Sequence, residues 1–203
     1  MKNVMPSQSQ QVTTINRINM NMRFITEKSN SNVVVTDVFS KLLQDRIIFI
    51  DNDITDNLAN SVISQLLYLD SLSKDEISIY INSYGGSVYD GLAIIDVMGF
   101  IDSPIKTVVL GKAMSMGALI FICGDKRQMT KRSTIMFHEI SSGMRGKISD
   151  MAVSYKEVER LSKVASKIVE LHTNVKDIDK AFQKDTYYGP TDALKLNITD
   201  EIL

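Results

Sequence analysis

The chain has 203 residues, a formal net charge of -1 at pH 7, and a composition that is 44% hydrophobic and 23% charged. These values are typical of a globular domain with a sizeable core, and the near-neutral charge does not favour nucleic acid or an anionic membrane as the main partner. The single cysteine, Cys123, excludes an intrachain disulfide framework, and two separated histidines give no zinc-binding pattern, so we expect neither a metal nor another cofactor.

The N-terminal segment differs in composition from the rest of the chain. Residues 1–34 are rich in Asn, Gln, Ser and Thr and lack the continuous apolar run of a signal peptide, which predicts a flexible arm. The longest nearly apolar run, residues 113–123, is shorter than the about 20 residues that a membrane-spanning helix needs. We therefore expect a soluble, cytoplasmic protein.

Strand and helix patterns alternate along the chain from residue 35. In chain order, the hydrophobic periodicity predicts helix 38–43, strand 46–50, helix 55–67, strand 77–81, helix 88–101, strand 105–110, helix 116–123 and strand 134–137. Such alternation is typical of βαβ units, so we predict an α/β fold built around a mainly parallel sheet. The basic pair Lys126-Arg127 falls between two of these elements and is interpreted as part of a solvated loop.

The pattern changes after residue 140. The glycine-containing stretch 141–147 predicts a flexible segment, and a long helix over residues 149–173 follows it. This helix has a narrow apolar stripe that needs a second surface to bury it, and a partner subunit is the simplest source. Two short helices, 178–182 and 190–196, and a strand at 198–203 complete the predicted domain over residues 35–203.

The first segment that could carry chemistry follows the strand at 105–110. Ser115 lies in Ala113-Met114-Ser115-Met116-Gly117, where a strand enters a tight turn and a helix begins. Such a turn exposes the serine hydroxyl, and the free backbone N–H of Met116 at the helix start can face developing negative charge. Taken alone, however, the segment fits an ordinary helix-capping serine better.

Two glycines follow the strand at 77–81. Gly85 and Gly86 allow a backbone amide to approach a ligand closely, so the amide of Gly86 could complete an oxyanion hole with that of Met116. A strand-to-helix turn capped by Ser87 is the simpler interpretation. A phosphate loop is a third one, but the Lys-Ser or Lys-Thr of the Walker pattern is missing.

The two histidines lie in different settings. His138 follows the strand at 134–137, where the end of a sheet opens to a cleft, so it is the candidate general base. His172 lies near the end of the long helix, where a positive ring suits the helix dipole, and is interpreted as structural. Asp185 could orient a catalytic histidine, but composition does not single it out among 24 acidic residues.

Taken together, these segments resemble the ClpP family, the proteolytic subunits of ATP-dependent Clp proteases, from about Asp37 to Leu203. The motifs that carry the resemblance are Leu43-Gln44-Asp45-Arg46-Ile47-Ile48-Phe49, Tyr80-Ile81-Asn82-Ser83-Tyr84-Gly85-Gly86-Ser87-Val88, Ala113-Met114-Ser115-Met116-Gly117-Ala118, His138 and Lys184-Asp185-Thr186. The resemblance implies a crotonase-like stack of βαβ units with a protruding handle, a strand plus the long helix, at about 140–174. It assigns Ser115 as nucleophile, His138 as general base and Asp185 as orienting carboxylate, with an oxyanion hole at Gly86 and Met116.

The resemblance also implies a substrate and partners. An unfolded polypeptide would bind as an extended strand between two segments, which are Gly85-Gly86-Ser87-Val88 and Ser142-Gly143. The subunits would form two stacked heptameric rings, and a AAA+ Clp ATPase unfoldase would dock through a pocket that includes Tyr80 and Phe100. The arm over residues 1–34 would then be a propeptide or an axial gate.

The sequence departs from the family at several positions. Tyr84 replaces the usual proline before the paired glycines, and Glu139-Ile140 replaces the usual Gln-Pro after the histidine. These changes bear on substrate register and partner choice, since the triad is intact. Two alternatives to a serine endopeptidase remain, a non-catalytic subunit of a mixed ring and an acyl-CoA enzyme of the crotonase superfamily, and the retained triad disfavours both.

Overall fold

The protein is described here by a computed structural model, which covers residues 24–29, 32–141, 143 and 145–203. These residues fall into two compact units, divided between Val38 and Phe39, and each unit is described on its own.

The N-terminal unit contains an antiparallel hairpin. β1 (Phe24–Ser29) pairs with β2 (Asn32–Asp37), from Phe24 opposite Asp37 to Ser29 opposite Asn32. The sequence patterns did not predict these two strands, because segments with little periodicity of their own here satisfy each other's backbone groups. Residues 1–23 lie outside the described residues, and the flexible arm over residues 1–34 stays a prediction.

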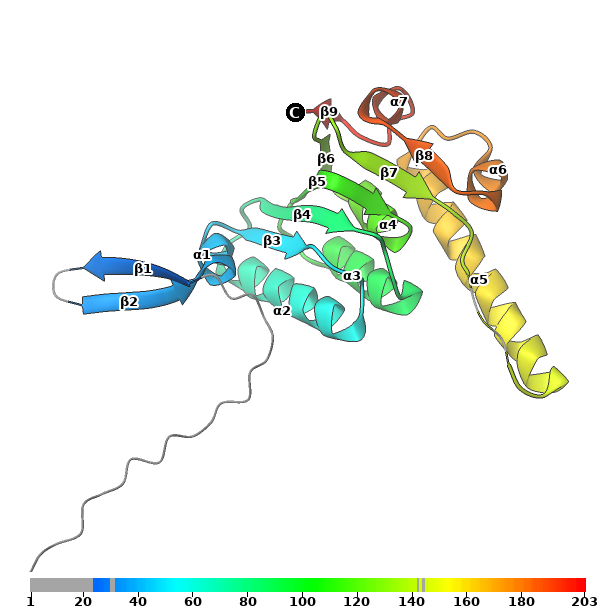
Figure 1. The fold of residues 1–203 in the computed structure, drawn as a ribbon, viewed down its shortest axis with the longest axis horizontal. Helices are drawn as coiled ribbons and strands as arrows, with labels where there is room; N and C mark the ends of the chain where they lie inside the picture. Colours follow the sequence, from blue (N-terminus) through cyan, green and yellow to red (C-terminus); the bar gives the residue numbers. More distant parts are fainter. Residues whose placement is uncertain (1–23, 30–31, 142, 144) are drawn as a thin grey trace, which may run out of the picture. The chain divides into compact units, whose positions relative to one another are not determined.

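Strands and helices alternate in the second unit, as predicted (Figure 1). The strands are β3 (Ile47–Ile50), β4 (Ile77–Ser83), β5 (Ile105–Met114), β6 (Lys126–Met129), β7 (Thr134–Phe137), β8 (Thr186–Tyr188) and β9 (Glu201–Ile202). The helices are α1 (Val38–Gln44), which begins at the boundary, α2 (Asp56–Leu72), α3 (Val88–Phe100), α4 (Met116–Ile122), α5 (Ile148–His172), α6 (Ile178–Gln183) and α7 (Pro190–Lys195).

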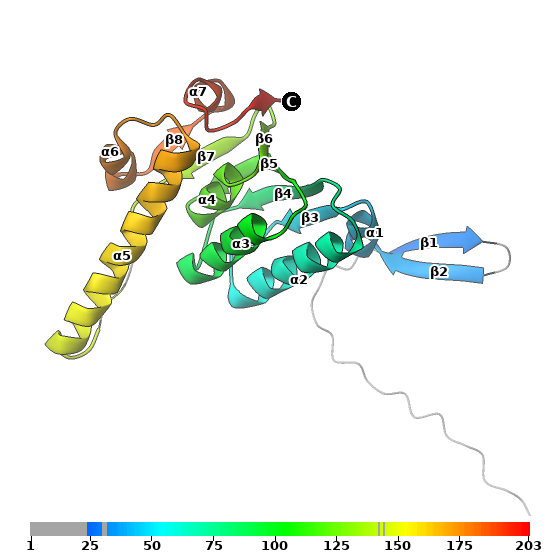
Figure 2. The same cartoon turned by 180° about the vertical axis from the view of Figure 1, so that it is seen from behind.

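The sheet of this unit is mainly parallel, which confirms the predicted α/β fold. Its strands follow the order β3-β4-β5-β6-β9, all parallel, while β7 pairs in parallel with β5 and β8 pairs antiparallel with β7. Helices α2, α3 and α4 lie side by side on one face (Figure 2). The core between these helices and the sheet consists of aliphatic side chains that include Ile48, Leu66, Ile79, Ile94, Val109 and Ile120.

β5 changes its partner partway along its length. Residues 106–109 pair with β6, and residues 112–114 pair with the start of β7. The strand therefore continues past residue 110, where the sequence predicted its end, because β7 supplies backbone partners for the second half. This extension carries the chain to Ser115 at the edge of the sheet.

Lys126 and Arg127 begin strand β6, so their interpretation as a solvated loop is wrong. The Arg127 side chain is buried and pairs with the carboxylate of Asp200, while it also donates to the backbone oxygens of His172 and Asn197. These partners lie 45 to 73 residues away along the chain, so local patterning could not reveal them. The contacts join β6 to the end of α5 and to the segment that leads into β9.

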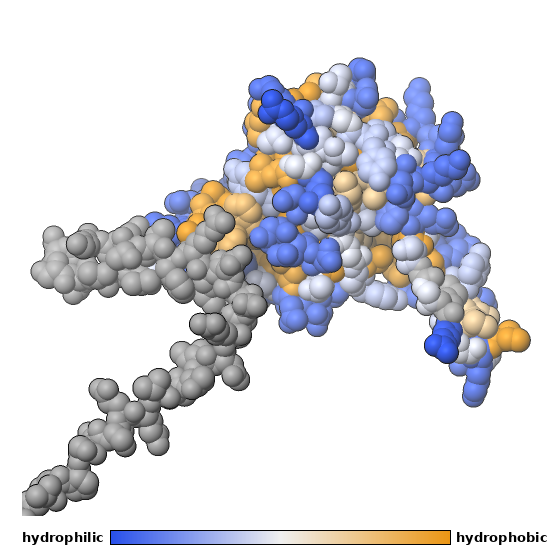
Figure 3. Space-filling model, in the orientation of Figure 1, coloured by the Kyte–Doolittle hydropathy of each residue, from blue (hydrophilic) through white to orange (hydrophobic). Residues whose placement is uncertain are grey.

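α5 extends well beyond the sheet (Figure 1). Its buried residues, Leu161, Ala165 and Val169, lie in its C-terminal part, where the helix packs on α4 and α6. In its N-terminal part Ile148, Val153 and Tyr155 are exposed. Figure 3 shows apolar side chains at the projecting end.

The strand predicted to precede this helix is not found in the described part of the handle. Residues 138–141, 143 and 145–147 form no strand, and Ser142 lies outside the described residues. A strand requires backbone partners, and the described residues of this chain supply none beside the segment. The predicted handle is therefore, within the described residues, the long helix and an irregular connection.

Candidate active site

Ser115 occupies a sharp turn between β5 and α4. Its backbone has φ 53° and ψ -124°, a conformation that is costly for a residue with a side chain and that is often found where a reactive group is positioned. Pairing continues past the end of β5, because the Ser115 N–H donates to the Met136 carbonyl oxygen over 2.8 Å. The Ser115 hydroxyl makes no capping bond to α4, so the ordinary capping interpretation is wrong.

The Ser115 hydroxyl instead contacts the candidate base. The distance between Ser115 Oγ and His138 Nε2 is 2.7 Å, within hydrogen-bond range. His138 directly follows β7, the strand that pairs with the end of β5, so the sheet itself brings the two residues together. A serine hydrogen-bonded to an imidazole is the arrangement of a nucleophile activated by a general base.

Asp185 lies on the other side of His138. β7 and β8 are antiparallel with Phe137 opposite Thr186, so the next position along each strand places His138 beside Asp185. Asp185 Oδ1 lies 3.8 Å from His138 Nδ1, which is within ion-pair range and too long for a hydrogen bond. The Asp185 side chain is 58% exposed. The three predicted residues are therefore brought together, with the Ser–His contact formed and the His–Asp contact open.

The paired glycines lie against the serine turn. Gly85 has φ 103°, and a Cβ on it would meet Met114 O and Ser115 Cβ at 2.7 Å and Met116 N at 3.0 Å, so only glycine fits this approach. Gly86, with φ 150°, forms an isolated parallel bridge with Ile54. In that bridge the Ile54 N–H donates to Gly85 O and the Ser87 N–H donates to Ile54 O, both over 2.8 Å.

This bridge determines which backbone groups stay free. Successive residues of an extended chain direct their N–H and C=O groups to opposite sides, so those of Gly86 face away from Ile54. Within the described residues neither the Gly86 N–H nor that of Met116, the first residue of α4, has an intramolecular acceptor. The two predicted oxyanion donors are thus unsatisfied N–H groups close to the serine turn.

Sequence reasoning missed a residue that holds the glycine loop. The Ser83 hydroxyl donates to Asn52 O over 2.6 Å and accepts the Gly85 N–H over 3.1 Å. Ser83 is 1% exposed and lies at the end of β4. No local signal marks it, because its partner Asn52 follows a different strand. Ser87, as one interpretation predicted, caps α3 through the Asp90 N–H at 3.5 Å.

An apolar pocket adjoins Ser115 and His138. Its lining comes from α3, α4, α5, α6 and the segment around β7, and consists of Val88, Ser115, Met116, Leu119, Phe137, His138, Ile140, Ala165 and Phe182. Of these, Leu119, Ile140, Ala165 and Phe182 were not predicted as site residues, because they follow the hydrophobic patterns of ordinary core positions. Its volume is about 20 Å³, so in this structure it is a narrow apolar recess next to the nucleophile and is too small for a whole side chain.

The other predicted site residues have different surroundings. Tyr80 stacks on Phe49 with ring centres 5.5 Å apart, and Phe100, at the end of α3, is 79% exposed. Within the described residues no aromatic pair joins Tyr80 to Phe100. Gly143 is described but is not in a strand, so the expected second substrate-pairing strand is not formed there.

Burial shifts the pKa of two further ionisable side chains, Cys123 and His172. Burial raises the pKa of the Cys123 thiol to about 12, which leaves almost no thiolate at neutral pH. Burial, together with the nearby Arg127 guanidinium, lowers the pKa of His172. Desolvation favours the neutral ring of His172, whereas the C-terminal end of a helix favours the charged one.

The described residues contain neither a metal-binding cluster nor a membrane-spanning helix. No group of three or more His, Cys, Asp or Glu side chains in the described ranges is placed to hold a metal ion. None of the helices in the part of the chain that the structure covers is both long and apolar enough to cross a membrane.

The sequence is similar to those of known proteins over most of its length. A model of the family described as Clp protease matches residues 28–203. The chain is 38% identical over 185 residues to the ATP-dependent Clp protease proteolytic subunit of Deinococcus radiodurans, across 89% of this chain and 91% of that protein. It is 39% identical over 186 residues to proteins of the same name from Bacteroides thetaiotaomicron and Bacteroides fragilis, across 89% of this chain and 84% and 89% of theirs. The resemblance is confirmed, and the chain belongs to the Clp protease family.

Proposed function

We propose that the chain is the proteolytic subunit of a self-compartmentalising, ATP-dependent Clp protease and a serine endopeptidase that cleaves unfolded polypeptides. The relatives at 38–39% identity carry the name of this subunit. The observation that carries the proposal is the 2.7 Å contact between Ser115 Oγ and His138 Nε2 at a strained turn.

The reaction follows from the groups around Ser115. His138 Nε2 accepts the hydroxyl proton as Ser115 Oγ attacks the peptide carbonyl carbon, and the oxyanion that forms accepts hydrogen bonds from the N–H groups of Gly86 and Met116. His138 then donates the proton to the leaving amine as the C–N bond breaks. Water, deprotonated by the same imidazole, hydrolyses the acyl-enzyme and restores the serine.

The open His–Asp contact bears on the resting state. At 3.8 Å, Asp185 attracts a protonated His138 but does not fix its ring through a hydrogen bond. In the proposed mechanism Asp185 closes on His138 when the particle assembles or the substrate binds, since catalytic hydrogen bonds are often long in unliganded enzymes.

The substrate would bind as an extended chain beside the glycine loop. Gly86 offers an unpaired N–H and C=O on the side away from Ile54, which suits backbone pairing with a peptide of any sequence. The apolar pocket beside Ser115 would have to widen to take up an apolar side chain next to the scissile bond.

The assembly completes the proposed function. We place the exposed apolar residues of the projecting part of α5 in the contact between two stacked heptameric rings. A AAA+ Clp ATPase would dock near Tyr80 and Phe100 and deliver unfolded chains to a cytoplasmic particle. ATP would be used by that partner, and this chain would need no cofactor.

Labelling with a fluorophosphonate tests the proposed chemistry. This reagent phosphonylates an activated serine, so we expect the mass of one adduct per chain, mapped to Ser115 by peptide mass spectrometry. Ser115→Ala should abolish both the adduct and the cleavage of unfolded casein fragments, while sizing columns report the same particle mass. An assembled protein that gives no adduct at Ser115 would contradict the proposal and favour a non-catalytic ring subunit.

A further inference from the structure

A buried serine hydroxyl connects the glycine loop to the segment after β3. Ser83, the last residue of β4, is 1% exposed, and its hydroxyl donates to Asn52 O over 2.6 Å. A hydroxyl has one proton and two lone pairs, so an oxygen that donates to Asn52 remains free to accept. The Ser83 oxygen accepts the Gly85 N–H over 3.1 Å. One side chain therefore bonds to backbone groups of two separate segments.

The peptide units on both sides of Gly85 are held in place. The Gly85 N–H, in the unit before it, bonds to Ser83, and Gly85 O, in the unit after it, accepts the Ile54 N–H over 2.8 Å. Peptide units are planar, so two fixed units leave little freedom to the φ and ψ angles between them. Gly85 has φ 103°, which is only one of the conformations open to a glycine. The Ser83 hydroxyl is thus one of the two contacts that select this conformation.

The second of these peptide units carries the proposed oxyanion donor. In a trans peptide unit the C=O and the N–H point in opposite directions, so Gly85 O directed at Ile54 turns the Gly86 N–H away from it. Gly85 is buried, so loss of the Ser83 hydroxyl leaves its N–H without an acceptor and away from water, which is costly. A rotation at Gly85 that exposes its N–H relieves this cost, and the same rotation moves the Gly86 N–H.

Ser83 also lies beside the helix that carries the second donor. A Cβ added to Gly117, the second residue of α4, would meet Ser83 Cβ and Ser83 O at 3.5 Å. A Cβ on Gly85 would meet Met116 N at 3.0 Å. Ser83 therefore contacts both segments that carry the proposed oxyanion donors, the glycine loop and the first turn of α4.

We propose that Ser83 is a positioning residue for the peptidase reaction, whose buried hydroxyl fixes the Gly85 conformation that directs the Gly86 N–H at the oxyanion. The proposal rests on the proposed function. The oxyanion forms only after Ser115 Oγ has attacked the peptide carbonyl, so a misplaced donor destabilises the transition state and not the bound substrate. The loss then falls on kcat, while KM stays nearly the same.

The test removes the hydroxyl from the assembled protein. Ser83→Ala should lower kcat for a short peptide by about 10- to 50-fold and change KM by less than about twofold. Ser83→Thr keeps a hydroxyl and should retain kcat within about threefold of the unaltered protein. Ser133→Ala is the matched control, because Ser133 is also 1% exposed and its hydroxyl donates to a backbone oxygen, Thr130 O, over 2.7 Å. This control should leave both kinetic constants unchanged.

A double variant tests the route through the glycine loop. Gly86→Ala displaces the same donor directly, because its Cβ would meet the Ile54 backbone. Adding Ser83→Ala to it should lower kcat by less than about threefold more, since both changes act on one N–H group. A serine that acted only on the stability of the fold would reduce kcat independently of Gly86. Losses of kcat that multiply in the double variant would overturn the proposal.

Amide hydrogen exchange separates this proposal from the proposed function. In Ser83→Ala the Gly85 amide should exchange several-fold faster, whether or not the protein is a peptidase. Unchanged exchange, an unchanged kcat, or a rise in KM at constant kcat would each overturn the proposal. If the unaltered protein is not labelled at Ser115, the proposed function fails and this role of Ser83 fails with it, while the exchange rate still reports whether the hydroxyl restrains the loop.

A further variant serves if Ser83→Ala does not assemble. Ser83→Cys keeps a side chain of similar size that is a weaker donor and acceptor. We expect it to show a smaller fall in kcat, again with KM nearly unchanged. An assembled Ser83→Cys protein with the kcat of the unaltered protein and unchanged exchange at Gly85 would overturn the proposal.

Discussion

Ser115 combines a strained backbone with a hydroxyl held by His138. The strain is imposed from both sides, since the Ser115 N–H bonds to Met136 O and the next residue begins α4. Backbone strain of this kind costs about 1–3 kcal/mol and persists only where the surrounding structure determines it. At the scale of single residues, the strand pairing around Ser115 therefore imposes its backbone conformation, because a serine does not itself prefer this conformation.

Asp185 is the member of the triad with the weakest contact, and its contribution can be measured. Asp185→Asn removes the charge that stabilises the imidazolium of His138, so we expect kcat to fall by about 10⁴. Steady-state kinetics on a short peptide measure the change, and Asp179→Asn, an exposed change on the neighbouring α6, should leave activity unaltered. Activity close to that of the unaltered protein would mean that another group orients His138.

Gly86 contributes both a conformation and a free N–H. In Gly86→Ala the new Cβ would meet the Ile54 backbone, with Ile54 N at 2.6 Å and Ile54 C at 2.9 Å, and φ 150° disfavours a side chain. The loop must shift and displace the oxyanion donor, so we expect kcat to fall by about 10². Gly99→Ala is the control, because a Cβ there meets nothing within 4 Å. Equal kcat values for the two variants would remove Gly86 from the oxyanion hole.

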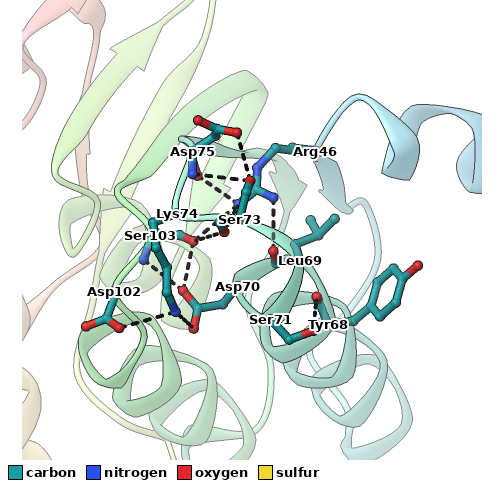
Figure 4. Close-up of polar contacts among 10 residues, drawn as sticks. All are labelled: Arg46, Tyr68, Leu69, Asp70, Ser71, Ser73, Lys74, Asp75, Asp102 and Ser103. Atoms are coloured by element: carbon teal, nitrogen blue, oxygen red, sulfur yellow. Dashed lines mark hydrogen bonds and ion pairs between the residues drawn. The ribbon is translucent and has the colours of Figure 1, made fainter.

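At the scale of elements, pairing between strands assembles the site, and a polar cluster links the end of α2 to neighbouring connections. Arg46, which precedes β3, donates to Leu69 O and Asp75 O over 3.0 and 2.8 Å, so it satisfies carbonyl groups where α2 ends (Figure 4). Asp70 accepts hydrogen bonds from the Ser103 N–H and hydroxyl, over 2.9 and 2.8 Å. The cluster joins the end of α2 to the connections before β4 and β5.

The Asp70 carboxylate makes the stability of these elements depend on pH. The hydrogen bond from Lys74, together with those from Ser103, lowers the pKa of Asp70 from 3.8 to about 2. A lowered folded-state pKa stabilises the fold above the unfolded pKa, and this stabilisation is lost as the pH falls through the folded pKa. The free energy of unfolding should therefore drop between about pH 4 and about pH 2 in the unaltered protein, and less so in Asp70→Asn.

Urea unfolding at a fixed protein concentration measures this difference. Asp102→Asn is the matched control, because Asp102 also pairs with Lys74, at 3.2 Å, but its side chain is 80% exposed. We expect this control to follow the unaltered protein over the whole range. An Asp70→Asn variant with the same loss of stability in acid would contradict the assignment.

At the scale of the whole molecule, the projecting part of α5 is a surface with exposed apolar side chains. Val153 is 70% exposed, and Val153→Glu would place a charge in the proposed contact between rings. We expect light scattering on a sizing column to report a smaller particle, because burying an unpaired charge is costly. Asn60→Glu, on the exposed side of α2, is the control. An unchanged particle mass for Val153→Glu would place the contact between rings elsewhere.

Much of the fold was predictable because its signals are local. The isoleucine-rich strands and the helices that follow Thr55 and Ser87 are indicated by runs and spacings within some 15 residues, and α2 and α3 begin at those caps. Ser115 and His138 could also be singled out from the sequence, since Ser115 directly precedes the predicted helix 116–123 and His138 directly follows the predicted strand 134–137. β8 and the pairing of the buried Arg127 with Asp200 could not be predicted, because their partners lie in distant parts of the chain.

The sequence by itself determined the alternation of strands and helices, the order of Ser115, His138 and Asp185, and the place of the glycine pair. Only the tertiary structure decided which of these residues meet. The partner change of β5 brings Ser115 to His138, and the antiparallel pairing of β8 with β7 brings Asp185 to the same ring. The physical reason is that periodicity encodes which face of an element is buried, whereas register depends on backbone pairing between segments that are distant in the chain.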